Sequence, residues 1–179
     1  SFQITDIPLI EYVASKGKPI IISTGIAELE DIELAVNTCR SAGNNQIALL
    51  KCTSSYPAPI NEANMTMVKD LENRFNVVSG LSDHTMGSTV PIVATALGAK
   101  IIEKHFTLSR TLKGPDHAAS LEPLELKNMV VAIRNIENAI SELVEENYSK
   151  ITLVTTMITR GGSHSEKEIP EELKKFQIE

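Results

Sequence analysis

Two histidines end apolar runs of the sequence and could together bind a divalent cation. His84 ends NVVSGLSDH, and His105 ends AKIIEKH. If these runs are neighbouring parallel strands, which lie about 4.8 Å apart, two imidazoles at matching heights can bind one ion. Substrate oxygens or water would fill the other positions. The alternative is that each imidazole is a hydrogen-bonded group of the core.

Alternation along a strand decides which side chains accompany the two histidines. His84 shares its face with Ser82, and His105 shares its face with Glu103. Glu103 would lie one layer deeper, where its carboxylate could bind the metal's water or orient a ligand. The intervening charged residues should face the covering helices or cap the next segment: Asp83 and Lys104.

Hydroxyl side chains follow the same apolar runs and could hold an anion. Together with backbone N–H groups at the starts of the following helices, they suit a phosphate. The alternative is ordinary capping of helix N-termini, which Ser and Thr perform at many helices. The candidates are Ser23, Thr24, Ser54 and Ser82, with Ser1 if the first residues follow a preceding strand.

A long loop over residues 107–123 precedes the last helical pattern. Loops of this length inside compact domains are often functional. Gly114-Pro115 would turn the chain and hold Asp116 near the strand ends, where a carboxylate could accept hydrogen bonds from sugar hydroxyls. The alternative is a solvated surface loop. Tyr56, in SSYPAP, is either a substrate contact or an amphipathic residue of the rim.

Four short apolar runs must position these side chains, and helical patterns separate them. We expect strands over residues 19–23, 46–52, 76–82 and 100–106. Helices are expected over 29–42 and 63–75, and over 123–145, where one apolar stripe persists. Gly43 and Gly98 are placed where helix C-caps belong, and Pro8 follows Asp6 as an early proline follows an N-cap.

Alternating strands and helices require a parallel sheet covered by helices. The two candidate architectures are an open doubly wound sheet and part of a (β/α)8 barrel. Neither GxGxxG nor GxxxxGK[ST] occurs, and polar residues end every strand, as they do at the active face of a barrel. We therefore predict an α/β fold of the TIM-barrel type, a partial barrel of about four β/α units over residues 1–146. Residues 147–179 are expected to form a linker or tail without an assigned role.

Composition and charge argue against some classes of binding partner. The 179-residue chain has a formal net charge of −6 and 4% aromatic residues, so it carries no electrostatic footprint for nucleic acid or an anionic membrane. No apolar run approaches the ~18 residues that span a bilayer, and the opening SFQIT has no secretory signal. Cys39 and Cys52 lack CxxC spacing, which favours a reducing cytoplasm. Exposed sheet edges predict self-association, as a homodimer or a larger assembly.

Five sequence blocks resemble, in order and with plausible intervals, the C-terminal half of the barrel domain of the sialic acid synthase family. That family includes N-acetylneuraminate, legionaminate and pseudaminate synthases and spore-coat polysaccharide relatives. The resemblance covers about residues 1 to 145. The blocks are KPIIISTGIAELEDIELAV, LLKCTSSYPAP, GLSDHTMG, ALGAKIIEKHFTLSR and KGPDHAASLEP.

The resemblance implies a metal-dependent condensation of phosphoenolpyruvate with an N-acetylated hexosamine such as N-acetylmannosamine. The products would be a nine-carbon 2-keto sugar acid and phosphate. It implies Mn²⁺ or Mg²⁺ as the metal. The implied metal ligands are His84 and His105; the implied phosphoenolpyruvate contacts are Ser1, Ser23, Ser54 and Ser82; the implied sugar contacts are Tyr56 and Asp116.

Two further residues are candidates for catalysis, Glu103 and Gln3. Gln3 stands where the family commonly has an acidic residue. Its amide can form hydrogen bonds but cannot take up a proton, so the resemblance implies no base at this position.

Two other functions stay open at this point. The sequence has neither the opening strands of the family's barrel nor its antifreeze-like C-terminal domain, so the chain could be a non-catalytic fragment that keeps the fold or ligand binding. It could also be a different metal-dependent aldolase, which would form a carbon–carbon bond from pyruvate without releasing phosphate.

Overall fold

The computed structural model describes residues 2–145, with side chains through residue 142. The chain divides into two compact units, Ser1–Glu142 and Leu143–Glu179. The tail expected over residues 147–179 lies outside the described residues, so the expected domain boundary stays a prediction.

Helices and strands alternate through the described chain, as the apolar pattern predicts. The strands begin or end within two residues of the predicted ones, and the long final helix has the predicted bounds. In chain order the elements are η1 (Phe2–Thr5), α1 (Ile7–Ala14), β1 (Ile20–Ser23), α2 (Leu29–Ser41), β2 (Ile47–Cys52), η2 (Ile60–Glu62), α3 (Thr66–Phe75), β3 (Val78–Asp83), α4 (Thr89–Ala96), β4 (Ile101–Lys104), η3 (His117–Ala119) and α5 (Pro123–Glu145).

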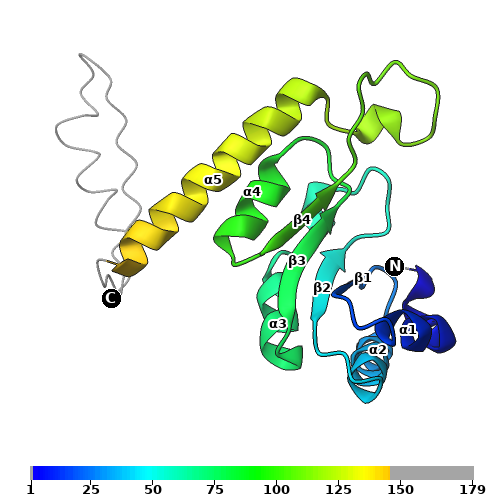
Figure 1. Ribbon diagram of the computed structural model, residues 1–179. Helices are drawn as coiled ribbons and strands as arrows, with labels where there is room; N and C mark the ends of the chain where they lie inside the picture. Colours follow the sequence, from blue (N-terminus) through cyan, green and yellow to red (C-terminus); the bar gives the residue numbers. More distant parts are fainter. Residues whose placement is uncertain (1, 146–179) are drawn as a thin grey trace, which may run out of the picture. The chain divides into compact units, whose positions relative to one another are not determined.

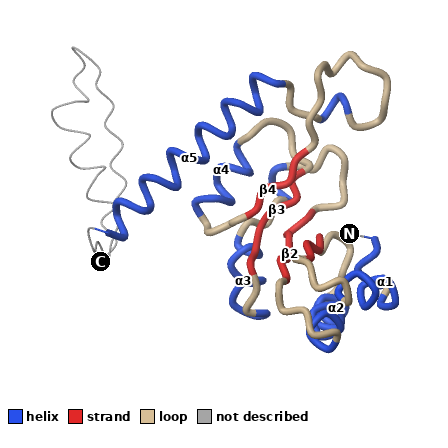
Figure 2. Tube along the Cα trace, viewed as in Figure 1, coloured by secondary structure: helices blue, strands red, loops and turns tan. Residues whose placement is uncertain are grey.

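The four strands form one parallel sheet in the order β1-β2-β3-β4. Figures 1 and 2 show them side by side, with α2, α3 and α4 in the connections. An open doubly wound sheet reverses its strand order at a switch point, whereas consecutive strands of a (β/α)8 barrel stay in chain order. The half-barrel prediction is therefore confirmed, and within the described residues β1 and β4 are edge strands.

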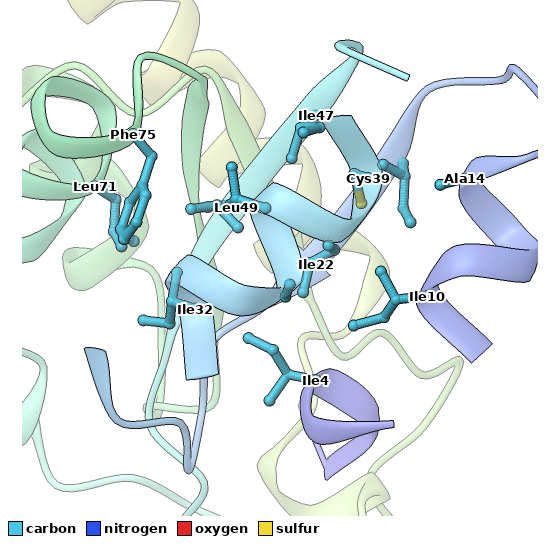
Figure 3. Close-up of a cluster of buried hydrophobic side chains, with 13 residues drawn as sticks. Ile4, Ile10, Ala14, Ile22, Ile32, Cys39, Ile47, Leu49, Leu71 and Phe75 are labelled. Carbon is cyan, nitrogen blue, oxygen red and sulfur yellow. The ribbon is translucent and has the colours of Figure 1, made fainter. Parts of the chain in front are cut away.

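Apolar stripes of the helices cover the outer face of the sheet. The stripe predicted for α2 is buried, and it packs with α1 and with the outward side chain of Leu49 on β2 (Figure 3). Removing such apolar area from water supplies most of the stabilisation of a domain this size, about 25 cal/mol per Å². The buried members of the α2 stripe are Ile32, Ala35, Val36 and Cys39.

The predicted caps delimit the helices. The Asp6 carboxylate accepts a hydrogen bond from the Leu9 amide at the start of α1. Gly43 and Gly98 follow α2 and α4 with φ of 79° and 102°, a backbone conformation that glycine adopts without the cost a Cβ would add.

The inner face of the half-barrel is the concave side of the sheet. Register aligns Leu50, Gly80 and Ile101 in one layer of this face. A Cβ added to Gly80 would lie 2.3 Å from the Ile101 carbonyl oxygen, so β3 and β4 approach each other here in a way that only glycine permits. Ile21 and Val78 also point to the concave face and remain 55% and 47% exposed.

A helix crosses a bilayer only when it is long and apolar enough. None of the helices within residues 2–145 is both long and apolar enough to cross a membrane.

Candidate active site

The two predicted metal ligands meet at the C-terminal end of the sheet. His84 directly follows β3 and His105 directly follows β4, and their ring centroids are 5.4 Å apart. Tyr56, from the loop after β2, places its ring 4.0 Å from that of His84 and 5.8 Å from that of His105. Three side chains expected at the mouth of the barrel thus form one aromatic cluster.

The main chain determines which nitrogen of His84 faces the cluster. His84 Nδ1 lies 2.9 Å from the Thr53 carbonyl oxygen. A carbonyl only accepts hydrogen bonds, so Nδ1 carries the hydrogen and Nε2 keeps a lone pair. Histidines that ligate metals usually donate their other ring N–H in this way.

The donor set fits a divalent ion held by two protein ligands. Among the described residues, no group of three or more His, Cys, Asp and Glu side chains is arranged to hold a metal. An ion between His84 and His105 would complete its coordination with oxygens of water or substrate. A mixed nitrogen and oxygen set suits a first-row transition ion such as Mn²⁺ better than Mg²⁺, which prefers oxygen ligands throughout.

Glu103 lies one layer deeper than the histidines, where alternation predicts it. Register pairs it with Ser82, whose hydroxyl donates a hydrogen bond of 2.6 Å to Glu103 Oε1. The carboxylate is exposed on the concave face. It can therefore accept a further hydrogen bond from a ligand or a water molecule above it.

Cys52 also belongs to the site, although the sequence analysis did not select it. Its sulfur lies 3.9 Å from His84 Nδ1. Burial raises the pKa of the thiol, but hydrogen bonds with His84, Ser82 and Ser54 outweigh burial, and the pKa lies below its usual range. The signal was available, because alternation puts positions 52 and 54 on the same face.

The same contact changes the basicity of His84. Burial disfavours the charged imidazolium, but hydrogen bonds to Cys52 and to the Thr53 carbonyl favour it, and the pKa of His84 lies above its usual value. Ligation of a metal requires the neutral ring.

The candidate hydroxyl side chains lie in different environments. Ser82 is buried beside Glu103, and Ser54 hydrogen-bonds the Cys52 thiol. Ser23 ends β1 in the layer of Leu50, below that of Ser82. The Thr24 hydroxyl donates to the Leu50 carbonyl and is thereby used within the sheet. Ser1 lies outside the described residues.

The loop after β4 brings Asp116 within electrostatic range of the mouth. Partial burial raises the pKa of the Tyr56 phenol, and the negative charges of Asp116 and Glu103 raise it further. The loop closes on itself, because the Leu121 amide donates to the His105 carbonyl. Asp116 is exposed at the start of η3, so its carboxylate is accessible to a ligand.

Gln3 is placed apart from the histidine pair. It lies in η1 with an exposed side chain, and it lines a cavity beside the edge strand β1 together with Ser23. Strand β2 lies between that edge strand and β3, the strand that His84 follows. The structure therefore brings Tyr56, His84 and His105 together above Ser82 and Glu103, with Gln3 and Ser23 at the β1 side.

Known proteins similar to this chain share its fold. The sequence pattern of the NeuB family matches residues 1–145. The chain is 45% identical over 148 residues to an N,N'-diacetyllegionaminic acid synthase of Campylobacter jejuni, covering 82% of this chain and 44% of that protein. It is 47% identical over 142 residues to a pseudaminic acid synthase of Helicobacter pylori, covering 79% and 42%.

A solved structure agrees with these sequence matches. The crystal structure of the Bacillus subtilis spore coat polysaccharide biosynthesis protein SpsE superimposes with a TM-score of 0.78 at 40% identity. The match covers 90% of this chain and 47% of that one. The chain thus spans less than half the length of these relatives.

Proposed function

The chain belongs to the NeuB family, and from this premise we propose that it forms the metal-bearing half of a sugar acid synthase. The reaction is the condensation of phosphoenolpyruvate with an N-acetylated hexosamine, such as N-acetylmannosamine, to a nine-carbon 2-keto sugar acid and phosphate. The observation that carries the proposal is the convergence of His84, His105 and Tyr56 at the C-terminal ends of the strands.

His84 and His105 would hold the divalent ion, Mn²⁺ or Mg²⁺. When bound, such an ion supplies Lewis-acid polarisation of a carbonyl oxygen, here that of the sugar aldehyde. The Thr53 carbonyl orients His84 through Nδ1 and keeps the lone pair of Nε2 available.

The remaining candidates would bind and orient the two substrates. Phosphoenolpyruvate carries anionic groups that accept hydrogen bonds from hydroxyls and backbone N–H groups. Tyr56 and Asp116 would meet the sugar, the phenol by packing on its ring and the carboxylate by accepting from hydroxyls. The proposed phosphoenolpyruvate contacts are Ser1, Ser23, Ser54 and Ser82.

Glu103 would orient the water molecule that the reaction consumes. The carbon–carbon bond forms between C3 of phosphoenolpyruvate and the aldehyde carbon, after which water adds at C2 and phosphate leaves. Glu103, held by the Ser82 hydroxyl, would accept a hydrogen bond from that water. Gln3 would contribute a hydrogen bond and no proton transfer.

A second candidate function is binding of the same ligands without turnover. The specific observation in its favour is the open concave face, where Ile21 is 55% exposed and Val78 is 47% exposed. Side chains of a closed barrel fill this space, and a site closed on one side only would exclude less water from the reaction.

Phosphate release from phosphoenolpyruvate and N-acetylmannosamine in the presence of Mn²⁺ tests the proposal. Turnover that requires both substrates, and that is lost in the variant His84→Ala, is the expected result. Mn²⁺ binding without phosphate release would instead favour the binding function. Carbon–carbon bond formation from pyruvate without phosphate release would overturn both and point to a different aldolase.

A further inference from the structure

A buried ion pair lies behind the histidine pair, on the helix-covered face of the sheet. Lys104 Nζ is 2.5 Å from Asp83 Oδ2, and the two side chains are only 3% and 2% exposed. Alternation places the charged pair and the imidazoles on opposite faces of the same two strand ends. Neither charged side chain therefore reaches the mouth of the half-barrel.

The ion pair joins the residues that come immediately before the two histidines. Register aligns Asp83 with Lys104 across β3 and β4, and His84 and His105 follow them in the chain. A bond between these side chains limits how far one strand end can slide or splay relative to the other. The spacing of the two imidazoles depends on the relative position of these strand ends.

Asp83 and Lys104 also form hydrogen bonds with Thr85, the residue after His84. Asp83 Oδ1 accepts a hydrogen bond of 3.0 Å from the Thr85 amide, and Oδ2 accepts one of 3.1 Å from the Thr85 hydroxyl. Lys104 Nζ donates a bond of 2.6 Å to the Thr85 carbonyl. The backbone of His84 is thus fixed on both sides by one network.

The network continues into the loop that carries Tyr56. Ala58 forms a parallel bridge with Thr85, and its amide donates a hydrogen bond of 2.8 Å to the His84 carbonyl. Two residues before Ala58, the Tyr56 ring lies over the His84 imidazole. Movement at Thr85 would therefore displace both the His84 imidazole and the Tyr56 ring.

A buried ion pair adds little to stability, because desolvation of the two charges offsets their attraction. Directional bonds, in contrast, specify one geometry. We propose that Asp83 and Lys104 are positioning residues that set the spacing and orientation of His84 and His105 through Thr85. This inference rests on the proposed function, since the geometry it protects is that of the proposed metal site.

The test uses the double variant Asp83→Asn/Lys104→Met, because removing one charge alone would leave its partner buried and unpaired. Asn keeps an acceptor for the Thr85 amide, and Met keeps the apolar length of Lys. We expect Mn²⁺ to bind about 10- to 100-fold more weakly, the usual effect of losing an outer-shell contact, while the melting temperature stays close to that of the unmutated chain. Titration calorimetry with Mn²⁺ alone measures both affinities.

A matched control removes an exposed pair from α3. Lys69 and Glu72 lie 2.9 Å apart on the helix surface, and Lys69→Met/Glu72→Gln should bind Mn²⁺ as the unmutated chain does. Unchanged Mn²⁺ affinity in Asp83→Asn/Lys104→Met would overturn the inference. Equal loss in both double variants would overturn it as well, since the effect would then follow the loss of any ion pair, wherever it lies.

A second readout does not depend on the metal. In the unmutated chain, nitrogen-15 spectra of the imidazoles should show His84 with hydrogen on Nδ1, and the Tyr56 and His84 rings should share nuclear Overhauser contacts. The double variant should lose both signatures, and retention of both would overturn the inference. If the unmutated chain binds no Mn²⁺, the proposed metal site fails, and these spectra still decide whether the ion pair positions His84.

A single variant covers the case in which the double variant does not fold. Lys104→Arg keeps the charge but replaces a compact ammonium with a planar fork, which cannot reproduce both short bonds to Asp83 and Thr85. We expect a folded protein with weakened Mn²⁺ binding and altered His84 spectra. A folded Lys104→Arg protein with unchanged affinity and spectra would contradict the positioning role.

Discussion

His84 uses both of its ring nitrogens in different ways. Nδ1 donates a hydrogen bond to the Thr53 carbonyl in the loop after β2, whereas Nε2 keeps its lone pair and is the proposed ligand atom. Its ring lies 4.0 Å from that of Tyr56 and 5.4 Å from that of His105. A single side chain thereby connects three loops of the mouth.

Replacement of His84 should therefore abolish a metal effect on stability. We expect Mn²⁺ at a free concentration of 100 times its Kd to stabilise the unmutated chain by about 2.7 kcal/mol, and to leave the melting temperature of His84→Ala unchanged. Calorimetric or fluorescence melting with and without Mn²⁺ measures the shift.

The control for this experiment is Met86→Ala, which shortens an exposed side chain that follows His84 and removes no ligand atom. It should keep the full Mn²⁺ shift. A shift that persists in His84→Ala would mean that the ion binds elsewhere.

At this scale, alternation was enough to predict which side chains share the site face. The inward direction of Ser82 and Glu103 and the outward turn of Asp83 follow from strand periodicity alone. Cys52 was overlooked because a cysteine in an apolar strand resembles any small core residue. Alternation places its thiol on the site face, and register with β3 puts it beside His84.

Strands β3 and β4 are the elements that carry the site, and Gly80 controls their approach. A Cβ at this position would lie 2.3 Å from a backbone oxygen, that of Ile101, and 2.7 Å from Leu50 Cδ2. The backbone contact cannot be relieved by a rotamer change. The strands would have to separate.

We expect Gly80→Ala to lower the free energy of unfolding by about 1–3 kcal/mol, the usual cost of overpacking, in urea denaturation. The adjacent variant Ser79→Ala is the control. It removes a buried hydroxyl for which the structure shows no hydrogen-bond partner, so it should be neutral or stabilising. If Gly80→Ala were as stable as Ser79→Ala, the close approach of the strands would be wrong.

The ends of helices and strands were predictable where the apolar periodicity of the sequence continues to the end of the element. The long apolar stripe of α5 predicted its bounds, whereas the strand expected over residues 100–106 ends at Lys104. Phe106 pairs instead with Leu121 as an isolated bridge. That contact comes from the far end of the loop over residues 107–123, which has no periodicity from which a partner could be inferred.

At the largest scale, the part of the chain within residues 2–142 has an open concave face, and β1 and β4 are the edge strands of its sheet. Apolar side chains that line the concave face are half exposed, as with Ile21, and an exposed sheet edge is a template for pairing with another chain. The sequence analysis predicted this fold class because strand–helix units of regular length require a parallel sheet. The contacts that cover the sheet edges were not predictable, because the alternation of apolar and polar residues along a strand contains no information about what pairs with its edge.

We expect the chain to self-associate through this face. Ile21→Lys should shift the mass measured by sedimentation or light scattering toward that of the monomer, because a charge on the concave face opposes burial. Leu34→Lys is the matched control, since Leu34 is an apolar residue of α2 that is 52% exposed. Monomeric mass for the unmutated chain, or equal effects of both variants, would contradict the prediction.

The order of the strands has a consequence for how the protein forms. Each strand pairs with the one made immediately before it, so each strand pairing in the described sheet spans a single strand–helix unit. During synthesis the sheet can grow by one strand–helix unit at a time, without waiting for distant segments to emerge. His84 and His105 come from the third and fourth of these strands, and their meeting would therefore be the last step in assembly of the sheet.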